Sequence, residues 1–230
     1  MPDKVISQTD KLNRLRAAVL GANDGVVSTA GLIFGVAGAT NNKGAIFTAG
    51  LAGLVAGAIS MAVGEYVSVS TQRDTERAYI EREKALLKKN PAGQLEDLAA
   101  YYQAKGVSHK TAMLFAKELS AKDPVKAHLA VELGLDESDL TNPISAGVAS
   151  FFAFGAGALV PLLFAVLSSD RLRIHLTLIA VVVALILTGY YSAKAGGSSR
   201  RKAVIRVLIG GVIGMAVTYG IGRLFGTAIS

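Results

Sequence analysis

Residues 44–64 read GAIFTAGLAGLVAGAISMAVG, a stretch of 21 residues that contains no Lys, Arg, Asp or Glu. About 20 apolar residues are enough for a helix to cross the hydrocarbon core of a bilayer. Four further uncharged stretches have comparable length, at 25–42, 140–169, 174–193 and 207–222. These stretches predict an all-α membrane protein with five transmembrane helices, at 16–39, 44–69, 144–168, 173–194 and 203–226.

The composition of the whole chain favours a membrane protein over a soluble enzyme. Hydrophobic residues make up 51% of the 230 residues and charged residues only 18%, and the mean hydropathy is +0.44. Soluble domains carry about 25% charged residues. The chain has no cysteine, which excludes disulfides, thiolate metal sites and cysteine nucleophiles. The net charge of +7 comes without a basic stripe interleaved with aromatic residues, so we expect no nucleic-acid binding.

The distribution of Lys and Arg predicts the orientation of the spans. These residues are concentrated in the N-terminal segment and in the loop that follows the fourth span, whereas the first hairpin has only Lys43. Cytoplasmic loops carry the excess of positive charge in membrane proteins. We therefore expect a cytoplasmic N-terminus and middle domain, in the cytoplasmic membrane of a prokaryote or a vacuolar-type membrane of a eukaryote. The first ten residues are polar, which argues against a cleavable signal peptide.

The middle of the chain has a different, charged character. It predicts three parts: 1–72 with the first two spans, 73–140 as a cytoplasmic helical domain inserted between spans 2 and 3, and 141–230 with the last three spans. Within 73–140 we expect the helix of span 2 to continue to about Lys89, with further helices at 95–104, at 109–120 and from 124 onward. Ser108 and Asp123 are predicted N-caps, and Gly134 a C-terminal stop.

Two acids and a methionine inside the first two spans predict a cation site. Asp24 lies eight residues beyond Arg16, roughly 12 Å deeper at about 1.5 Å per residue. A carboxylate at that depth is costly and indicates function. Glu65 is the second intramembrane acid, and Met61, four residues earlier, projects from the same helix face. If the two acids lie at matching depth, they and the thioether suit a divalent cation of intermediate softness.

The middle domain offers further candidate ligands. His128 and Glu132 have the i, i+4 spacing that allows one metal ion to be shared, and Glu83 and Asp97 lie on the preceding helices. The alternative is that these are ordinary solvated acids paired with lysines. No E-x-x-H pair is present, which argues against a ferritin-like di-iron site.

Two long motifs resemble those of a known family. Residues 15–29 read LRAAVLGANDGVVST and residues 60–69 read SMAVGEYVSV. They are similar to the first-span and second-span signatures of the vacuolar iron transporter family. The run 132–134 before Asn142-Pro143, followed by 155–161, also resembles the family, so that the likeness extends over roughly residues 12–225.

This resemblance implies a homodimer of five-span subunits that exports ferrous iron, and often manganese, from the cytoplasm in exchange for protons. It places the family's intramembrane Asp and Met ligands on Asp24 and Met61, and cytoplasmic carboxylate ligands on Glu83 and Glu132. The chain departs from the family's pattern at five positions of the middle domain, where it has Leu86, Gln94, Asp97 and His128-Leu129.

The leading functional prediction is therefore a transporter of Fe²⁺, with Mn²⁺ and Co²⁺ as further ions that oxygen and thioether ligands admit, and with no prosthetic group. Its predicted partners are divalent metal ions, protons, the lipid bilayer and a second copy of the chain. The alternative is a membrane-anchored metal sensor or storage protein, although an anchor would not need Asp24 and Glu65. An enzyme is not expected, because no Ser-His-acid set, metal-histidine motif or phosphate-binding loop is present.

Overall fold

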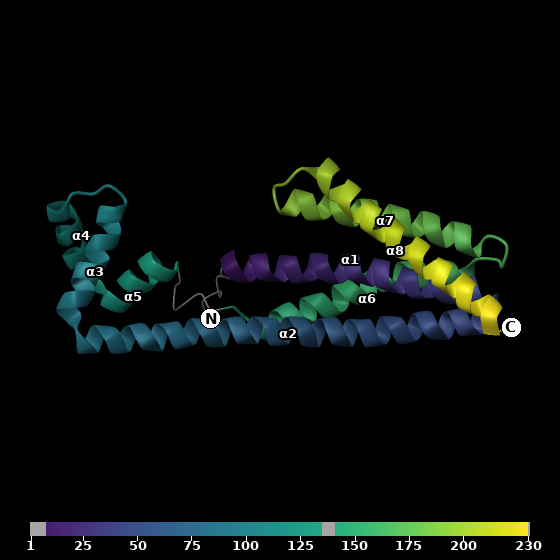
Figure 1. Cartoon of the computed structure of the whole chain (residues 1–230), viewed down its shortest axis with the longest axis horizontal. Coiled ribbons are helices and arrows are strands. Elements are labelled where there is room, and N and C mark those ends of the chain that lie inside the picture. Colours follow the sequence, from purple (N-terminus) through teal and green to yellow (C-terminus); the bar gives the residue numbers. More distant parts are fainter. Residues whose placement is uncertain (1–7, 135–140, 230) are drawn as a thin grey trace, which may run out of the picture. The chain divides into compact units, whose positions relative to one another are not determined.

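The computed structural model describes residues 8–134 and 141–229, and these residues form eight α-helices and one short π-helix, with no strand among them (Figure 1). The α-helices are α1 (Gln8–Ala39), α2 (Lys43–Lys89), α3 (Pro91–Ala104), α4 (His109–Lys122), α5 (Pro124–His128), α6 (Pro143–Leu167), α7 (Arg173–Ala195) and α8 (Arg200–Ile229), and the π-helix is η1 (Leu129–Leu133). Five helices are long and apolar enough to cross a membrane, namely α1, α2, α6, α7 and α8. This confirms the five spans that the uncharged stretches predict.

The chain divides into two compact units. The spanning unit comprises Leu12–Val67 and Pro143–Ser230, and the small unit comprises Met1–Lys11 and Ser68–Asn142. The boundary at Ser68 falls inside α2, a few residues before the boundary at 72 and 73 that the change in composition predicts.

Helix α1 packs closely against α6 in the spanning unit. A Cβ atom added at Gly25 would overlap the carbonyl oxygen of Phe154, and one added at Gly157 would overlap the carbonyl oxygen of Ala22. The glycines therefore allow the two backbones to touch, as small residues commonly do between membrane helices. Farther along, α1 joins α7 and α8 in one core cluster of buried residues: Val26, Ala30, Phe34, Val181, Leu185 and Met215.

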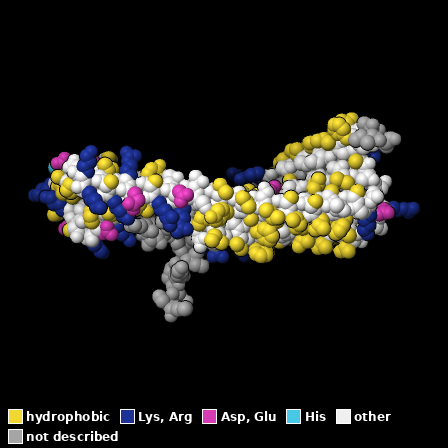
Figure 2. All heavy atoms as spheres, turned by 90° about the horizontal axis from the view of Figure 1, so that it is seen from below, with side chains coloured by type: hydrophobic (Ala, Val, Ile, Leu, Met, Phe, Trp, Pro, Cys, Tyr) yellow, Lys and Arg dark blue, Asp and Glu magenta, His cyan; other side chains and the backbone are white. Residues whose placement is uncertain are grey.

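The outer surface of the spanning unit is apolar. On α2, Val55, Ile59 and Val63 are each about half exposed, and α8 presents Ile209 and Ile213 in the same way. Figure 2 shows hydrophobic side chains gathered over the spanning unit, while Lys and Arg side chains gather over the small unit. A continuous apolar surface of this kind is expected where protein meets lipid.

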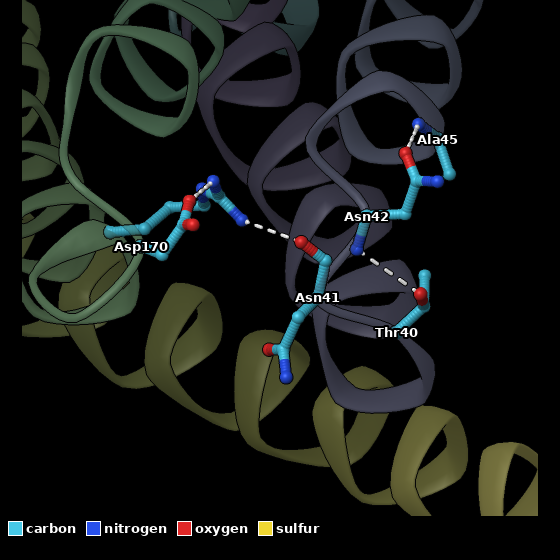
Figure 3. Close-up of polar contacts among 6 residues, drawn as sticks. Thr40, Asn41, Asn42, Ala45 and Asp170 are labelled. Atoms are coloured by element: carbon cyan, nitrogen blue, oxygen red, sulfur yellow. Dashed lines mark hydrogen bonds and ion pairs between the residues drawn. The ribbon is translucent and has the colours of Figure 1, made fainter.

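A buried arginine connects two helical hairpins at one end of the spanning unit. Arg173 is 3% exposed, its Nη2 pairs with the carboxylate of Asp170, and its Nη1 donates to the carbonyl oxygen of Asn41 at 3.3 Å. Figure 3 shows Asn41 and Asp170 on either side of this guanidinium, with Asn42 capping the first turn of α2. This contact ties the α1–α2 hairpin to the α6–α7 hairpin.

The small unit is a packed group of short helices. Ser108 and Asp123 cap α4 and α5 by accepting from backbone N–H groups three residues ahead, and Gly134 has a positive φ of 62°, as predicted for these three positions. The start of α3 differs from the prediction. Asn90 accepts a hydrogen bond from the Gly93 N–H, so the helix begins at Pro91 rather than at 95. The core between α3 and α4 is built from Leu98, Ala99, Ala112 and Ala116.

Candidate metal site in the spanning unit

A small cavity between α1 and α2 contains the intramembrane Asp and Met. Its volume is about 230 Å³, and Asp24 and Met61 both line it. The other lining residues are Ser28, Thr29 and Leu32 of α1, Gly53, Gly57 and Ser60 of α2, and Phe154 of α6. Helix periodicity explains most of the set, since positions three or four apart on one helix share a face. The structure thus brings Asp24 and Met61 together in one cavity.

The polar groups at this cavity are poorly satisfied by the protein. In the described part of the chain, the Asp24 carboxylate forms no hydrogen bond or ion pair, although Asp24 is partly buried. The Thr29 hydroxyl is fully buried and also has no hydrogen-bond partner there. Ser28 instead donates to the backbone carbonyl of Asp24 at 2.5 Å. Buried polar groups without partners are rare, and they indicate a site for an ion or water.

The donor set of the cavity fits a divalent cation of intermediate softness. It offers carboxylate and hydroxyl oxygens with one thioether sulfur. Oxygen donors suit Mn²⁺ and Fe²⁺, and the thioether adds affinity for the softer ion. A single carboxylate neutralises only half of a divalent charge, so this donor set would hold a divalent ion less tightly than a closed structural site does. Among the described side chains, no group of three His, Asp or Glu residues comes together that could hold a metal ion by itself.

Glu65 lies outside this cavity. Its Oε1 is 2.8 Å from Nη2 of Arg16, and its side chain is 9% exposed whereas that of Arg16 is 57% exposed. Because Arg16 precedes Asp24 by eight residues on α1, Glu65 pairs nearer the N-terminal end of that helix. Glu65 is therefore not among the residues that line the cavity with Asp24 and Met61, and the equal depth of the two acids stays a prediction.

Of the predicted ligands of the small unit whose side chains the structure describes, two lie together and one does not. His128 Nδ1 lies 3.3 Å from Oε1 of Glu83, and both side chains are buried. Asp97 is exposed and accepts a hydrogen bond from Gln94 at 3.3 Å. The side chain of Glu132 lies outside the part of the chain that the structure describes, so the predicted sharing of a metal by His128 and Glu132 stays a prediction.

Two contacts and one lining residue at these sites are not predicted by the sequence. Arg16 marks the edge of the span in the sequence, and in the structure it is the partner of Glu65. Thr29 lines the cavity five residues after Asp24, a spacing that does not place two residues on one helix face, so periodicity gives no signal for it. Glu83 lies on α2 and His128 on α5, so no spacing within one helix predicts their pairing.

Comparison with known proteins identifies the family. The model of the VIT family matches residues 15–223. The chain is 41% identical over 211 residues to "Vacuolar iron transporter" of Acanthamoeba castellanii, covering 91% of this chain and 78% of that protein. It is 36% identical over 215 residues to "Vacuolar iron transporter homolog 2.1" of Arabidopsis thaliana, covering 93% and 82%, and 38% identical over 213 residues to "Vacuolar iron transporter homolog 1" of Oryza sativa, covering 92% and 74%.

These matches cover both sequence motifs and all five spans. The family's members are transporters, which confirms the prediction that the protein is not an enzyme. Five apolar helices and a matching family model over nine-tenths of the chain agree with each other. The protein is thus a multi-pass membrane protein that belongs to the VIT family.

Proposed function

We propose that this protein transports a divalent metal ion, ferrous iron first and manganese or cobalt besides, through the cavity between α1 and α2. The observation that carries the proposal is the partnerless carboxylate of Asp24, which faces the same cavity as Met61. A desolvated carboxylate without a protein partner is unfavourable unless a cation or proton occupies it. The names of the relatives, vacuolar iron transporters, support iron as the cargo.

The same carboxylate gives metal–proton exchange a physical basis. Asp24 is the only acid lining the cavity, so a metal ion and a proton compete for one group. Metal binding requires the ionised carboxylate, and release is assisted when a proton takes its place. Net movement of metal in one direction then accompanies net movement of protons in the other.

We assign the end of the spanning unit that carries Arg16 to the cytoplasm. The C-terminal end of α7 and the N-terminal end of α8 add Lys194, Arg200, Arg201, Lys202 and Arg206 to that end. At the opposite end, Arg173 is buried and paired with Asp170, so it adds little to the charge difference. The positive-inside rule then supports a cytoplasmic N-terminus and middle domain. Transport out of the cytoplasm is the direction that the family resemblance implies.

Glu65 and the small unit have accessory roles in this proposal. Glu65, paired with Arg16, receives the cation before it reaches Asp24. Glu83 and His128 form the centre of a second binding group, which raises the local metal concentration. Asp97 and Glu132 are further ligands that the sequence predicts for it. The functional unit is a homodimer, as the resemblance implies.

Metal flux into proteoliposomes tests the proposal. Purified protein is reconstituted, and uptake of Fe²⁺ under reducing conditions and of Mn²⁺ is followed with and without a pH gradient. Saturable uptake that responds to the gradient supports metal–proton exchange, and uptake indifferent to the gradient contradicts the exchange. Metal binding without any flux would favour the alternative, a membrane-anchored sensor or storage protein.

A further inference from the structure

The C-terminal part of the spanning unit is strongly cationic. After Asp170 the sequence contains eight Lys and Arg residues and no acid. Five of the eight lie between positions 194 and 206, where α7 ends and α8 begins. We call these five the cationic turn: Lys194, Arg200, Arg201, Lys202 and Arg206. All five are exposed, and none forms an ion pair with an acid in the described part of the chain.

One arginine of the cationic turn is held in place. The Arg200 guanidinium lies 4.9 Å from the centre of the Tyr190 ring, and its Nη1 donates to the Tyr190 hydroxyl at 3.1 Å. Stacking and hydrogen bonding together restrict an otherwise flexible side chain. The remaining N–H groups of the guanidinium can still bind an anion.

An apolar crevice begins beside this turn. It has a volume of about 720 Å³, and its walls come from α1, α6 and α7, including Leu15, Val19, Leu187 and Tyr191. Lys194 is the only charged residue that lines it. The crevice therefore has an apolar interior and a cationic edge.

We propose that this crevice and the cationic turn bind an anionic phospholipid. An acyl chain fills the crevice, and the phosphate lies against Lys194 and the arginines of the turn. Clusters of Lys and Arg next to a membrane helix attract anionic lipid headgroups, and a tyrosine beside them suits the interface between headgroups and hydrocarbon. A soluble anion or an acidic peptide has no chain to place in an apolar crevice, so the lipid matches both halves of the site.

Native mass spectrometry of the full-length protein, released from a neutral detergent, tests the proposal with two lipid probes. We expect phosphatidylglycerol to be retained on the protein about tenfold more than phosphatidylcholine with the same acyl chains, because only the first carries a net charge. In the double variant Lys194→Gln/Arg201→Gln, retention of phosphatidylglycerol should fall about fivefold for each charge removed.

Two variants separate this site from general attraction of lipid to a basic protein. Lys43→Gln/Arg171→Gln removes the same number of exposed cations at the other end of the unit and should leave retention unchanged. Ala18→Phe places a ring in the crevice without changing charge, and it should lower phosphatidylglycerol retention. Thermal unfolding in detergent verifies that each variant is folded.

Three results would overturn the proposal. The first is equal retention of the two lipids. The second is equal loss in the two double variants, which would make the attraction non-specific. The third is displacement of the lipid by glycerol 3-phosphate at equal concentration, which would make the turn a phosphate site that needs no acyl chain.

Discussion

Arg16 on α1 and Glu65 on α2 form an ion pair of 2.8 Å, one helix turn beyond Met61 on α2 and two turns before Asp24 on α1. The Glu65 side chain is largely buried, so its charge is held mainly by the arginine. A metal ion that approaches from this end must compete with Arg16 for the carboxylate. The pair therefore sets how readily a cation enters.

The competition predicts opposite effects for the two halves of the pair. Arg16→Gln should lower the KM for metal uptake about two- to fivefold. The half-exposed ion pair that competes with the metal ion for Glu65 is worth about 0.5–1 kcal/mol, and this substitution removes it. Glu65→Gln should raise the KM by a similar factor. Initial rates of Mn²⁺ uptake measure both. A rise in KM in both variants would make the pair a structural contact only.

Asp24→Asn should abolish transport while the protein remains as stable as before. The carboxylate has no protein partner in the described part of the chain, so the amide breaks no contact and removes a charge that is costly to bury. Flux should fall about a hundredfold or more. The bound metal ion and the Asp24 carboxylate form a charge pair, and losing one member of a buried charge pair costs about 3–5 kcal/mol. Asp74→Asn, an exposed acid in the small unit, is the control. Normal flux through folded Asp24→Asn would refute the role of Asp24.

Met61→Leu should change the choice of metal. Leucine keeps the volume of the side chain and removes the sulfur, which helps Fe²⁺ more than Mn²⁺. We expect the ratio of Fe²⁺ to Mn²⁺ flux to fall about tenfold or less, with the dependence on the pH gradient intact. Competition uptake with both ions in one assay gives the ratio directly. An unchanged ratio would assign Met61 to packing.

Glu83 and His128 should act as one unit in metal binding by the small unit. Their side chains lie 3.3 Å apart and are both buried. The background is full-length protein that carries Asp24→Asn. In this background Glu83→Gln and His128→Asn should each weaken Mn²⁺ binding. The double variant should bind no more weakly than either single variant, since the effects of substitutions within one site are not additive. Calorimetry measures the affinities. Asp97→Asn, an exposed residue, should have less effect, and additive losses would contradict a shared site.

Two glycines on α6 should respond differently to the same substitution. Gly157→Ala places a methyl group on the backbone of α1 at Ala22, whereas nothing lies within 4 Å of a Cβ at Gly155. Overpacking costs about 1–3 kcal/mol, which lowers Tm by about 2–12 °C in a chain of this size. Gly155→Ala should leave Tm unchanged or raise it. Thermal unfolding of both variants in one detergent decides the question.

The spans and the caps at Ser108 and Asp123 follow from local rules of length and capping. Asp24 and Met61 lie on different helices, and the motifs of the family, rather than a local rule, point to both. The pairing of Glu65 with Arg16 has no such signal, because it joins α2 to α1. The small unit shows the same limit, because His128 on α5 meets Glu83 on α2, and no spacing within one helix predicts that contact. Pairings between helices depend on packing that a local pattern does not contain.

The contact between Arg173 and Asn41 has a consequence for the order of assembly during synthesis. It joins residues 132 positions apart, and the core around Val26 needs Val181 and Met215 from the last two spans. At about 5–20 residues per second, α1 waits roughly 10–30 s before these partners emerge from the ribosome. Until α6 is made, α1, with Asp24 in its middle, has only α2 as a spanning neighbour from its own chain, and α7 and α8 follow later still. The first hairpin must therefore persist in the bilayer as a loose pair, and its final packing is among the last steps of folding.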